Sequence, residues 1–176
     1  MLKRGVTVWF TGLSCSGKTT ISKLVEANLR ERGFAVEVLD GDVVRQNLSQ
    51  GLGFTKTDRD INIQRIAFIS KLLTRNGVIT LVAAISPYRE ARELARKEIG
   101  GFVEVYVKSP LDICITRDVK GLYKKALEGS IPHFTGISDP YEEPLQPELV
   151  LYTDREPPEE SAGKVLRYLQ ELRYFS

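Results

Sequence analysis

The sequence predicts an α/β protein with three layers, in which a mostly parallel β-sheet lies between helices on both faces. Two observations favour this class. Short apolar segments rich in β-branched residues alternate with longer segments whose apolar residues recur at helical spacing. A Gly-rich turn joins the first apolar segment to the first helical one. Because strand–helix–strand connections are right-handed, this alternation covers both faces of a parallel sheet.

The first strand and the first helix are marked by a change of periodicity. Residues 6–11 are apolar, β-branched and aromatic, which is typical of a buried strand. Trp9 in this run is expected in the core. After a Gly-rich turn at residues 12–17, apolar residues recur at helical spacing up to Leu29. Gly33 is expected to end this helix.

The middle of the chain continues the alternation. Residues 35–40 are predicted as the second strand, and residues 57–76 as a helix that Gly77 closes. Residues 78–85 form the most apolar run and should be a central strand. Pro87 can open the next helix at its first turn. We expect the charged residues of that helix to lie in solvent: Arg89, Glu90, Arg92 and Glu93.

The last third of the chain is interrupted by a segment of different character. The expected elements are a strand at 102–107, a short helix at 110–116, a strand at 148–152 and a helix from Pro158 to Leu172. Residues 119–147, here named the lid segment, contain repeated glycines and prolines and lack a long apolar face. Such a stretch between core elements is more often a mobile lid than a packing element. We expect one domain over residues 1–176. Near its C-terminus, the aromatic residues either pack the last helix or contact a second copy of the chain: Tyr168, Tyr174 and Phe175.

The composition excludes several classes of protein. With 42% apolar and 27% charged residues, the chain is neither disordered nor collagen-like. A net charge of +2, without a basic block, gives no case for a nucleic acid or an anionic membrane as partner. No apolar run approaches the roughly 20 residues that cross a bilayer, and residues 1–5 lack a signal-peptide pattern. Two cysteines and one histidine predict neither a disulfide framework nor a zinc site. From these observations together we expect a cytoplasmic protein.

A phosphate-binding motif lies between the first strand and the first helix. Residues 12–19 read GLSCSGKT and match G-x-x-x-x-G-K-[ST] in the strand–helix context that the motif requires. Gly12 and Gly17 allow a sharp turn and a close approach to an anion. Successive backbone N–H groups then face the anion at a helix N-terminus. Lys18 can reach the β- and γ-phosphates, and the Thr19 hydroxyl can bind Mg²⁺.

Two carboxylates follow the second strand. The chain has no Asn-Lys-x-Asp guanine motif, and the strand at 78–85 ends in Ser86-Pro87 rather than in an acidic residue. Asp40 and Asp42 flank a glycine where ligands gather in open parallel sheets. They can serve Mg²⁺-bound water and an acceptor hydroxyl. Alternatively, Asp42 caps a helix, and the two roles can coexist.

A basic and aromatic cluster lies downstream, with Arg45, Arg59, Asn62 and Arg65 around Phe54. Arginines bind multi-oxygen anions through two parallel hydrogen bonds. An aromatic side chain beside them can stack on a base. The cluster suggests an acceptor that has a nucleobase and an additional anionic group. A solvated basic helix face is the alternative interpretation.

These motifs and several longer blocks resemble the adenylylsulfate kinases, which use ATP to phosphorylate the 3′-hydroxyl of adenosine 5′-phosphosulfate. The resemblance runs from Gly12 to near the C-terminus. Besides residues 12–19, the matching blocks are 39–45, 52–54, 58–66, 85–89, 120–126 and 134–142. The last two blocks together are the most specific. The resemblance implies a P-loop kinase fold, the cofactors ATP and Mg²⁺, and a free-standing enzyme of sulfate activation, and we expect a homodimer.

The motifs and the resemblance together assign roles by position. The expected ATP-binding residues are Gly12, Leu13, Ser14, Cys15, Ser16, Gly17, Lys18, Thr19, Thr20, Arg117 and Lys120. The expected substrate-binding residues are Asp40, Asp42, Arg45, Phe54, Arg59, Asn62, Arg65, Ile85, Ser86, Leu122 and Phe134. The expected catalytic residues are Lys18, Asp40, Asp42 and Ser86, with Thr19 as metal ligand.

Ser86 needs a separate hypothesis. The serine at this position of the family has been proposed to form a phosphoserine intermediate. A serine nucleophile needs a base within hydrogen-bond reach, and residues 84–88 supply none. We therefore expect Ser86 to bind the substrate or shape its pocket.

The chain departs from the family pattern at Cys15, where a small residue is usual, and at Val119, which replaces a frequent proline.

Overall fold

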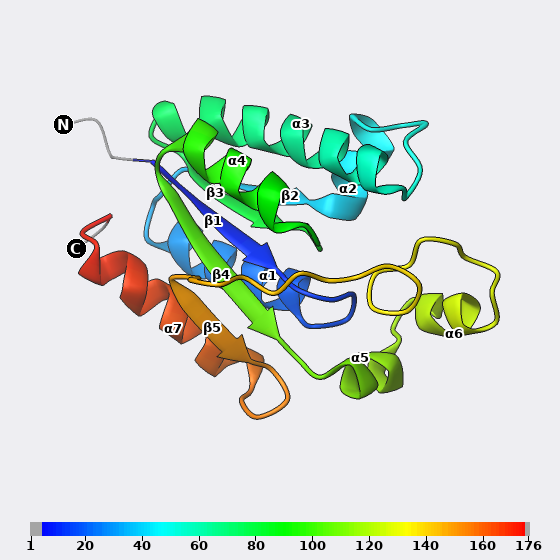
Figure 1. Ribbon diagram of the computed structural model, residues 1–176. Helices are drawn as coiled ribbons and strands as arrows, with labels where there is room; N and C mark the ends of the chain where they lie inside the picture. The colour runs from blue at the N-terminus through cyan, green and yellow to red at the C-terminus, as the bar shows by residue number, and fades with distance from the viewer. Residues whose placement is uncertain (1–4, 175–176) are drawn as a thin grey trace.

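The computed structural model describes residues 5–174, and within them a five-stranded parallel sheet forms the centre of the fold (Figure 1). The strands are β1 (Val6–Thr11), β2 (Val36–Asp40), β3 (Ile79–Ala83), β4 (Phe102–Lys108) and β5 (Leu149–Tyr152). Their order is β2-β3-β1-β4-β5, and every neighbouring pair is parallel. The predicted α/β class is confirmed, and every predicted strand is present with bounds shifted by no more than a few residues.

Helices cover both faces of this sheet (Figure 1). The helices are α1 (Lys18–Glu31), α2 (Gly41–Asn47), α3 (Lys56–Arg75), α4 (Arg89–Ile99), α5 (Leu111–Arg117), α6 (Leu122–Leu127) and α7 (Pro158–Glu171). Successive residues of β1 point to opposite faces, so Phe10 packs in the core with α1 and α7, while Trp9 packs in the core with α3 and α4. The burial expected for Trp9 is thereby confirmed. Tyr168 and Tyr174 pack against the α1–α7 core, and Phe175 lies outside the described residues.

Two short helices, α2 and α6, were not among the expected elements, although a helix capped by Asp42 was an open alternative. Helix α2 begins at Gly41, directly after β2. Its cap is Asp40, whose carboxylate accepts a hydrogen bond from the Asp42 backbone N–H at 3.0 Å. The expectation that Asp42 caps this helix is wrong, because the helix starts one residue before it. Helix α4 likewise begins at Arg89 after a Tyr88 cap, rather than at Pro87.

Arg92 on α4 is buried, which contradicts the expectation that it lies in solvent. Only 2% of its surface is exposed, and its guanidinium pairs with Glu104 of β4 at 2.9 Å. The neighbouring Arg89, Glu90 and Glu93 are exposed, as predicted. The local sequence marks a charged helix face but does not reveal a carboxylate that a distant strand supplies.

The lid segment has a small apolar core, which the sequence analysis did not expect. Tyr123, Ala126 and Phe134 are buried together with Cys114 of α5, and the Tyr123 and Phe134 rings meet edge to face at 5.0 Å. The apolar residues of this core are few and separated by turns, so they form no long helical stripe in the sequence. Among the described residues, no helix has the length and apolar character needed to span a membrane.

Candidate functional site

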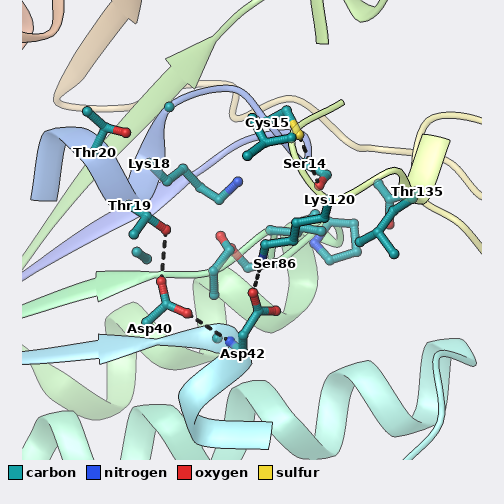
Figure 2. A pocket seen from close by; sticks show the side chains of 18 of the residues that line it. Ser14, Cys15, Lys18, Thr19, Thr20, Asp40, Asp42, Ser86, Lys120 and Thr135 are labelled. Atoms are coloured by element: carbon teal, nitrogen blue, oxygen red, sulfur yellow. Dashed lines mark hydrogen bonds and ion pairs between the residues drawn. The ribbon is translucent and has the colours of Figure 1, made fainter. Parts of the chain in front are cut away.

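A cavity of about 1050 Å³ lies beyond the carboxyl ends of the central strands. Ligands bind at this edge in open parallel sheets. The wall of the cavity combines the Gly-rich loop before α1, the β2–α2 turn, α3, the residues after β3 and the lid segment. Figure 2 shows labelled side chains from the Gly-rich loop, the β2–α2 turn, the residues after β3 and the lid segment around this cavity. One cavity therefore collects most of the predicted site residues.

The Gly-rich loop wraps around the Lys18 side chain. The Lys18 ammonium donates to the backbone carbonyls of Gly12 at 3.0 Å and Leu13 at 2.7 Å. Gly12 is required here, because an added Cβ would lie 2.4 Å from the Val107 carbonyl oxygen. Burial lowers the pKa of Lys18 to about 8. The Lys18 ammonium is thus held in a partly dehydrated position. An anion bound beside it would favour its charged form.

Two side chains with oxygen atoms meet beside Lys18. The Thr19 hydroxyl donates to the second carboxylate oxygen of Asp40 at 2.8 Å (Figure 2). Asp40 therefore serves both as the cap of α2 and as the partner of Thr19, through its two different oxygens. The neighbouring Asp42 is exposed and forms an ion pair with Lys120 of the lid segment. The two carboxylates thus face different partners, as distinct roles would require.

The opposite wall of the cavity is aromatic and cationic. The Phe54 ring lies 4.5 Å from the Arg45 guanidinium and 5.4 Å from that of Arg59. Arg59 also donates to the His133 carbonyl at 2.8 Å, which ties α3 to the lid segment. Burial, followed by the nearby positive charge of Arg45, lowers the pKa of Arg59. These cations are stacked and partly dehydrated, which strengthens their attraction for an anion.

Asn62 is the clearest sign of a ligand on this wall. The residue is only 4% exposed and lines the cavity, and its buried side-chain oxygen has no hydrogen-bond partner in the structure. An unsatisfied buried acceptor costs roughly 1–3 kcal/mol. Such an atom is expected where a ligand supplies the missing donor. This position therefore fits a ligand that brings an N–H or O–H group.

Ser86 lines the cavity, but its hydroxyl is engaged in the interior. The residue is 2% exposed, its oxygen accepts from the Trp9 indole N–H at 3.0 Å, and its hydroxyl donates to Thr11 at 3.0 Å. No carboxylate is bonded to this hydroxyl among the described residues. These bonds fix the Ser86 hydroxyl in the pocket wall, and its positioning role stays a prediction.

Some predicted residues lie apart from the cavity. The Arg65 guanidinium donates to the Leu48 carbonyl at 2.6 Å, and Arg65 does not line the cavity. Gly12, Leu13 and Ser16 belong to the loop around Lys18, but they do not line the cavity. The other predicted residues line the cavity: Ser14, Cys15, Gly17, Lys18, Thr19, Thr20, Asp40, Asp42, Arg45, Phe54, Arg59, Asn62, Ile85, Ser86, Arg117, Lys120, Leu122 and Phe134.

Several lining residues were missed by the sequence analysis, including Lys23, Thr135, Thr153 and Glu156. Thr153 connects two parts of the wall, since its hydroxyl donates to the Ser16 carbonyl at 2.6 Å and its carbonyl accepts from Arg117 at 2.6 Å. It directly follows β5. Its place at the carboxyl end of a predicted parallel strand was the available signal.

Comparisons with known proteins agree with this geometry. The family model described as "Adenylylsulphate kinase" matches residues 4–152. An adenylyl-sulfate kinase of Halothermothrix orenii is 60% identical over 99% of this chain and 94% of its own length. The structure of the Mycobacterium tuberculosis APS kinase CysC in complex with AMPPNP and APS is 47% identical, with a TM-score of 0.92 over 95% of this chain and 98% of that one. A hexameric APS kinase from Thiobacillus denitrificans is 35% identical, with a TM-score of 0.76 over 99% of this chain and 30% of that one.

Proposed function

The chain belongs to the adenylylsulfate kinase family, and we propose that its cavity transfers the γ-phosphoryl group of ATP to the 3′-hydroxyl of adenosine 5′-phosphosulfate. The observation that carries this proposal is the arrangement of one cavity, with the Gly-rich loop on one wall and the Phe54 ring between two arginines on the other. A donor and an acceptor nucleotide can bind there side by side. The products are ADP and 3′-phosphoadenosine 5′-phosphosulfate, the activated form of sulfate.

The donor phosphates are assigned to the loop before α1. Its backbone N–H groups and the N-terminus of α1 favour negative charge. Lys18 is free to exchange its two carbonyl partners for phosphate oxygens of higher charge. Arg117, held against Thr153 and the carbonyl of Cys15, contributes to the wall on the same side. These groups neutralise the charge that develops on the phosphoryl oxygens.

The residues present fit a magnesium ion beside these phosphates. Mg²⁺ is usually held by one or two protein oxygens, while water and phosphate complete its octahedron. Thr19 and Asp40 supply such oxygens 2.8 Å apart at the cavity wall. When bound, Mg²⁺ supplies positive charge that offsets the phosphate oxygens. We therefore propose a small site in which Thr19 and Asp40 are the two protein ligands.

The acceptor is assigned to the opposite wall. Phe54 and Phe134 offer ring faces or edges to the adenine, and Arg45 and Arg59 offer charge to the phosphosulfate group. The unpaired Asn62 oxygen accepts from a donor on the acceptor nucleotide. Asp42 receives the hydroxyl proton as the new P–O bond forms and the bond to the β-phosphate breaks. Phosphoryl transfer needs little covalent help when the two oxygens are aligned.

An acceptor panel tests this function. ADP release is measured with ATP, Mg²⁺ and one of adenosine 5′-phosphosulfate, AMP, gluconate or shikimate. We expect turnover with adenosine 5′-phosphosulfate and background rates with the other three compounds. Faster turnover of gluconate, shikimate or AMP would assign the chain to another small-molecule kinase, and nucleotide binding without turnover would indicate a binding module.

The proposal extends to the assembly and location of the protein. We propose that this chain forms a homodimer. Light scattering after size-exclusion chromatography should give twice the 19.8 kDa of one chain, whereas the mass of one chain would contradict the dimer. We place the reaction in the cytoplasm, where ATP is available and where the free thiols of Cys15 and Cys114 would remain reduced.

A further inference from the structure

The buried Arg92 side chain joins three parts of the chain that are distant in sequence. Its guanidinium pairs with Glu104 of β4 at 2.9 Å, donates to the Ser86 carbonyl at 2.6 Å, and donates to the Glu142 carbonyl at 2.7 Å. With 2% exposure, the charge is almost fully dehydrated. A buried charge is tolerated when it is paired and hydrogen-bonded, and each of the three guanidinium nitrogens of Arg92 has one of these partners.

One of these partners is a strained residue of the pocket wall. Ser86 has a φ of 43°, which lies in the left-handed region that non-glycine residues rarely adopt, at a cost of about 1–3 kcal/mol. Trp9 and Thr11 hold its side chain, and Arg92 holds its carbonyl. Ile85 and Ser86 both line the cavity. Arg92 therefore fixes the backbone from which this part of the wall is formed.

Another partner lies at the C-terminal end of the lid segment. The Glu142 backbone N–H donates to the Pro87 carbonyl at 2.8 Å, and the Tyr141 hydroxyl bonds to Thr11 at 2.9 Å. Arg92 adds the bond to the Glu142 carbonyl and lies 5.8 Å from the Tyr141 ring. The same arginine thus fastens the end of the lid segment to the strand ends and to the Ser86 backbone.

We propose that Arg92 is a positioning residue for the acceptor nucleotide. It sets the Ser86 wall and the root of the lid segment at a fixed distance from each other, without touching the substrate. The contacts of Arg92 lie on the acceptor side of the cavity. Loss of the Arg92 side chain should therefore weaken binding of the acceptor and leave binding of the ATP phosphates unchanged. This inference rests on the proposed function, since it assigns the acceptor to that wall.

Arg96 provides a matched control. It lies one helical turn away on α4, pairs with the same Glu104 at 3.3 Å and binds Glu148 at 2.5 Å. It bonds to neither Ser86 nor Glu142. Arg92→Lys keeps the charge beside Glu104 but cannot reach both carbonyls with a planar fork. Arg96→Lys disturbs the same ion-pair network without disturbing the cavity wall.

Steady-state kinetics of both variants, together with their melting temperatures, test the proposal. For Arg92→Lys we expect the KM for adenosine 5′-phosphosulfate to rise about tenfold or more, because small displacements of a substrate-positioning wall have large effects. The KM for ATP should stay within about twofold. Arg96→Lys should lower the melting temperature while leaving both KM values within about twofold of wild type. Unchanged acceptor KM in Arg92→Lys, or equal changes in the two variants, would overturn the proposal.

A second variant covers the case in which Arg92→Lys does not fold. Tyr141→Phe removes only the hydroxyl bond to Thr11 at the same root of the lid segment, and its acceptor KM should also rise while its ATP KM does not. An unchanged acceptor KM in Tyr141→Phe would then overturn the proposal. Wild-type turnover of adenosine 5′-phosphosulfate is measured in parallel, so failure of the proposed function appears as an inactive wild type and not as an unchanged KM.

Discussion

At the residue scale, the site depends on side chains whose hydrogen-bond partners hold them at the wall of the cavity. The Lys18 ammonium is bonded to two carbonyls of the loop that precedes it. Burial favours its neutral form and lowers its pKa to about 8, whereas the bound phosphates would favour its charged form. Nucleotide binding and the protonation of Lys18 are therefore linked.

The linkage gives a pH dependence with a definite sign. Above about pH 8 the free protein loses the Lys18 proton that nucleotide binding requires, so the affinity for a non-hydrolysable ATP analogue should fall by about 25-fold between pH 7.5 and 9.5. The stability of the nucleotide-free protein changes in the opposite direction. The folded pKa lies below the unfolded one, so the Lys18 contribution to the free energy of unfolding rises from about pH 8 to 10.5.

Calorimetric titration of the analogue over this pH range measures the first effect. Lys18→Arg is the control, since arginine stays charged throughout; its affinity should be weaker but nearly independent of pH. An affinity that does not change with pH in the wild type would show that Lys18 stays charged over this range. The lowered pKa that we attribute to burial would then be wrong.

Ser86 supplies the second prediction at this scale. Its hydroxyl donates to Thr11 and accepts from Trp9, and within residues 5–174 no carboxylate is bonded to it. Ser86→Ala should weaken acceptor binding and lower kcat by no more than one to two powers of ten, about 1.4–2.7 kcal/mol. Rapid-quench assays with γ-labelled ATP measure both the rate and any labelled protein. Nearly complete loss of turnover in folded Ser86→Ala, with trapped phosphoserine in the wild type, would establish a covalent route instead.

At the scale of elements, the lid segment is fastened at both ends and packed in its middle. Its C-terminal end is bonded to Pro87 and Arg92, as described above. Near its N-terminal end, helix α6 packs on α5 and places the Tyr123 hydroxyl 2.9 Å from the Ser14 carbonyl, to which it donates. The small core of the lid segment thus holds the outer side of the phosphate-binding loop.

Tyr123→Phe tests this contact between α6 and the loop. The ring keeps its edge-to-face packing on Phe134, while the bond to Ser14 is lost. A net hydrogen bond contributes about 0.5–1.5 kcal/mol, so the KM for ATP should rise by a factor of about two to ten. The acceptor KM should change less, which is the reverse of the Arg92→Lys pattern. If the acceptor KM rises more than the ATP KM, the contact does not act through the phosphate-binding loop.

The long elements were predictable because their signals are local. Helical spacing in α1 and α3, and continuous apolar runs in β1 and β3, depend on neighbouring residues alone. The short helices α2 and α6 were missed, since they contain few residues and depend on contacts with Asp40 and with α5. The buried state of Arg92 depends on Glu104, Ser86 and Glu142, and no local pattern brings these groups together.

The same distinction applies to the site. The Gly-rich motif identifies Lys18 and Thr19 because eight consecutive residues specify one loop. Arg65 was expected with Asn62 in the cluster around Phe54, yet its guanidinium donates to the Leu48 carbonyl, because nearness in the sequence does not determine which way a side chain points. Thr153 has no motif around it and enters the cavity only through the pairing of β5 with β4.

At the scale of the whole molecule, the parallel sheet brings distant segments to one edge. The residues that follow β1, β2 and β3 all line one cavity, which α3 and the lid segment complete. Alignment of a donor and an acceptor then needs no movement of the sheet. Since catalysis of phosphoryl transfer is mainly positioning and charge neutralisation, this architecture accounts for the proposed reaction without a covalent intermediate.

The most direct test of this account identifies where the phosphoryl group goes. ³¹P NMR of a reaction containing the protein, Mg²⁺, ATP and adenosine 5′-phosphosulfate follows donor loss and product formation together. We predict one ADP for each new phosphomonoester, with the new phosphate on the 3′-oxygen and the phosphosulfate group intact. ATP consumption without this monoester, or a phosphate at any other position of the acceptor, would contradict the account.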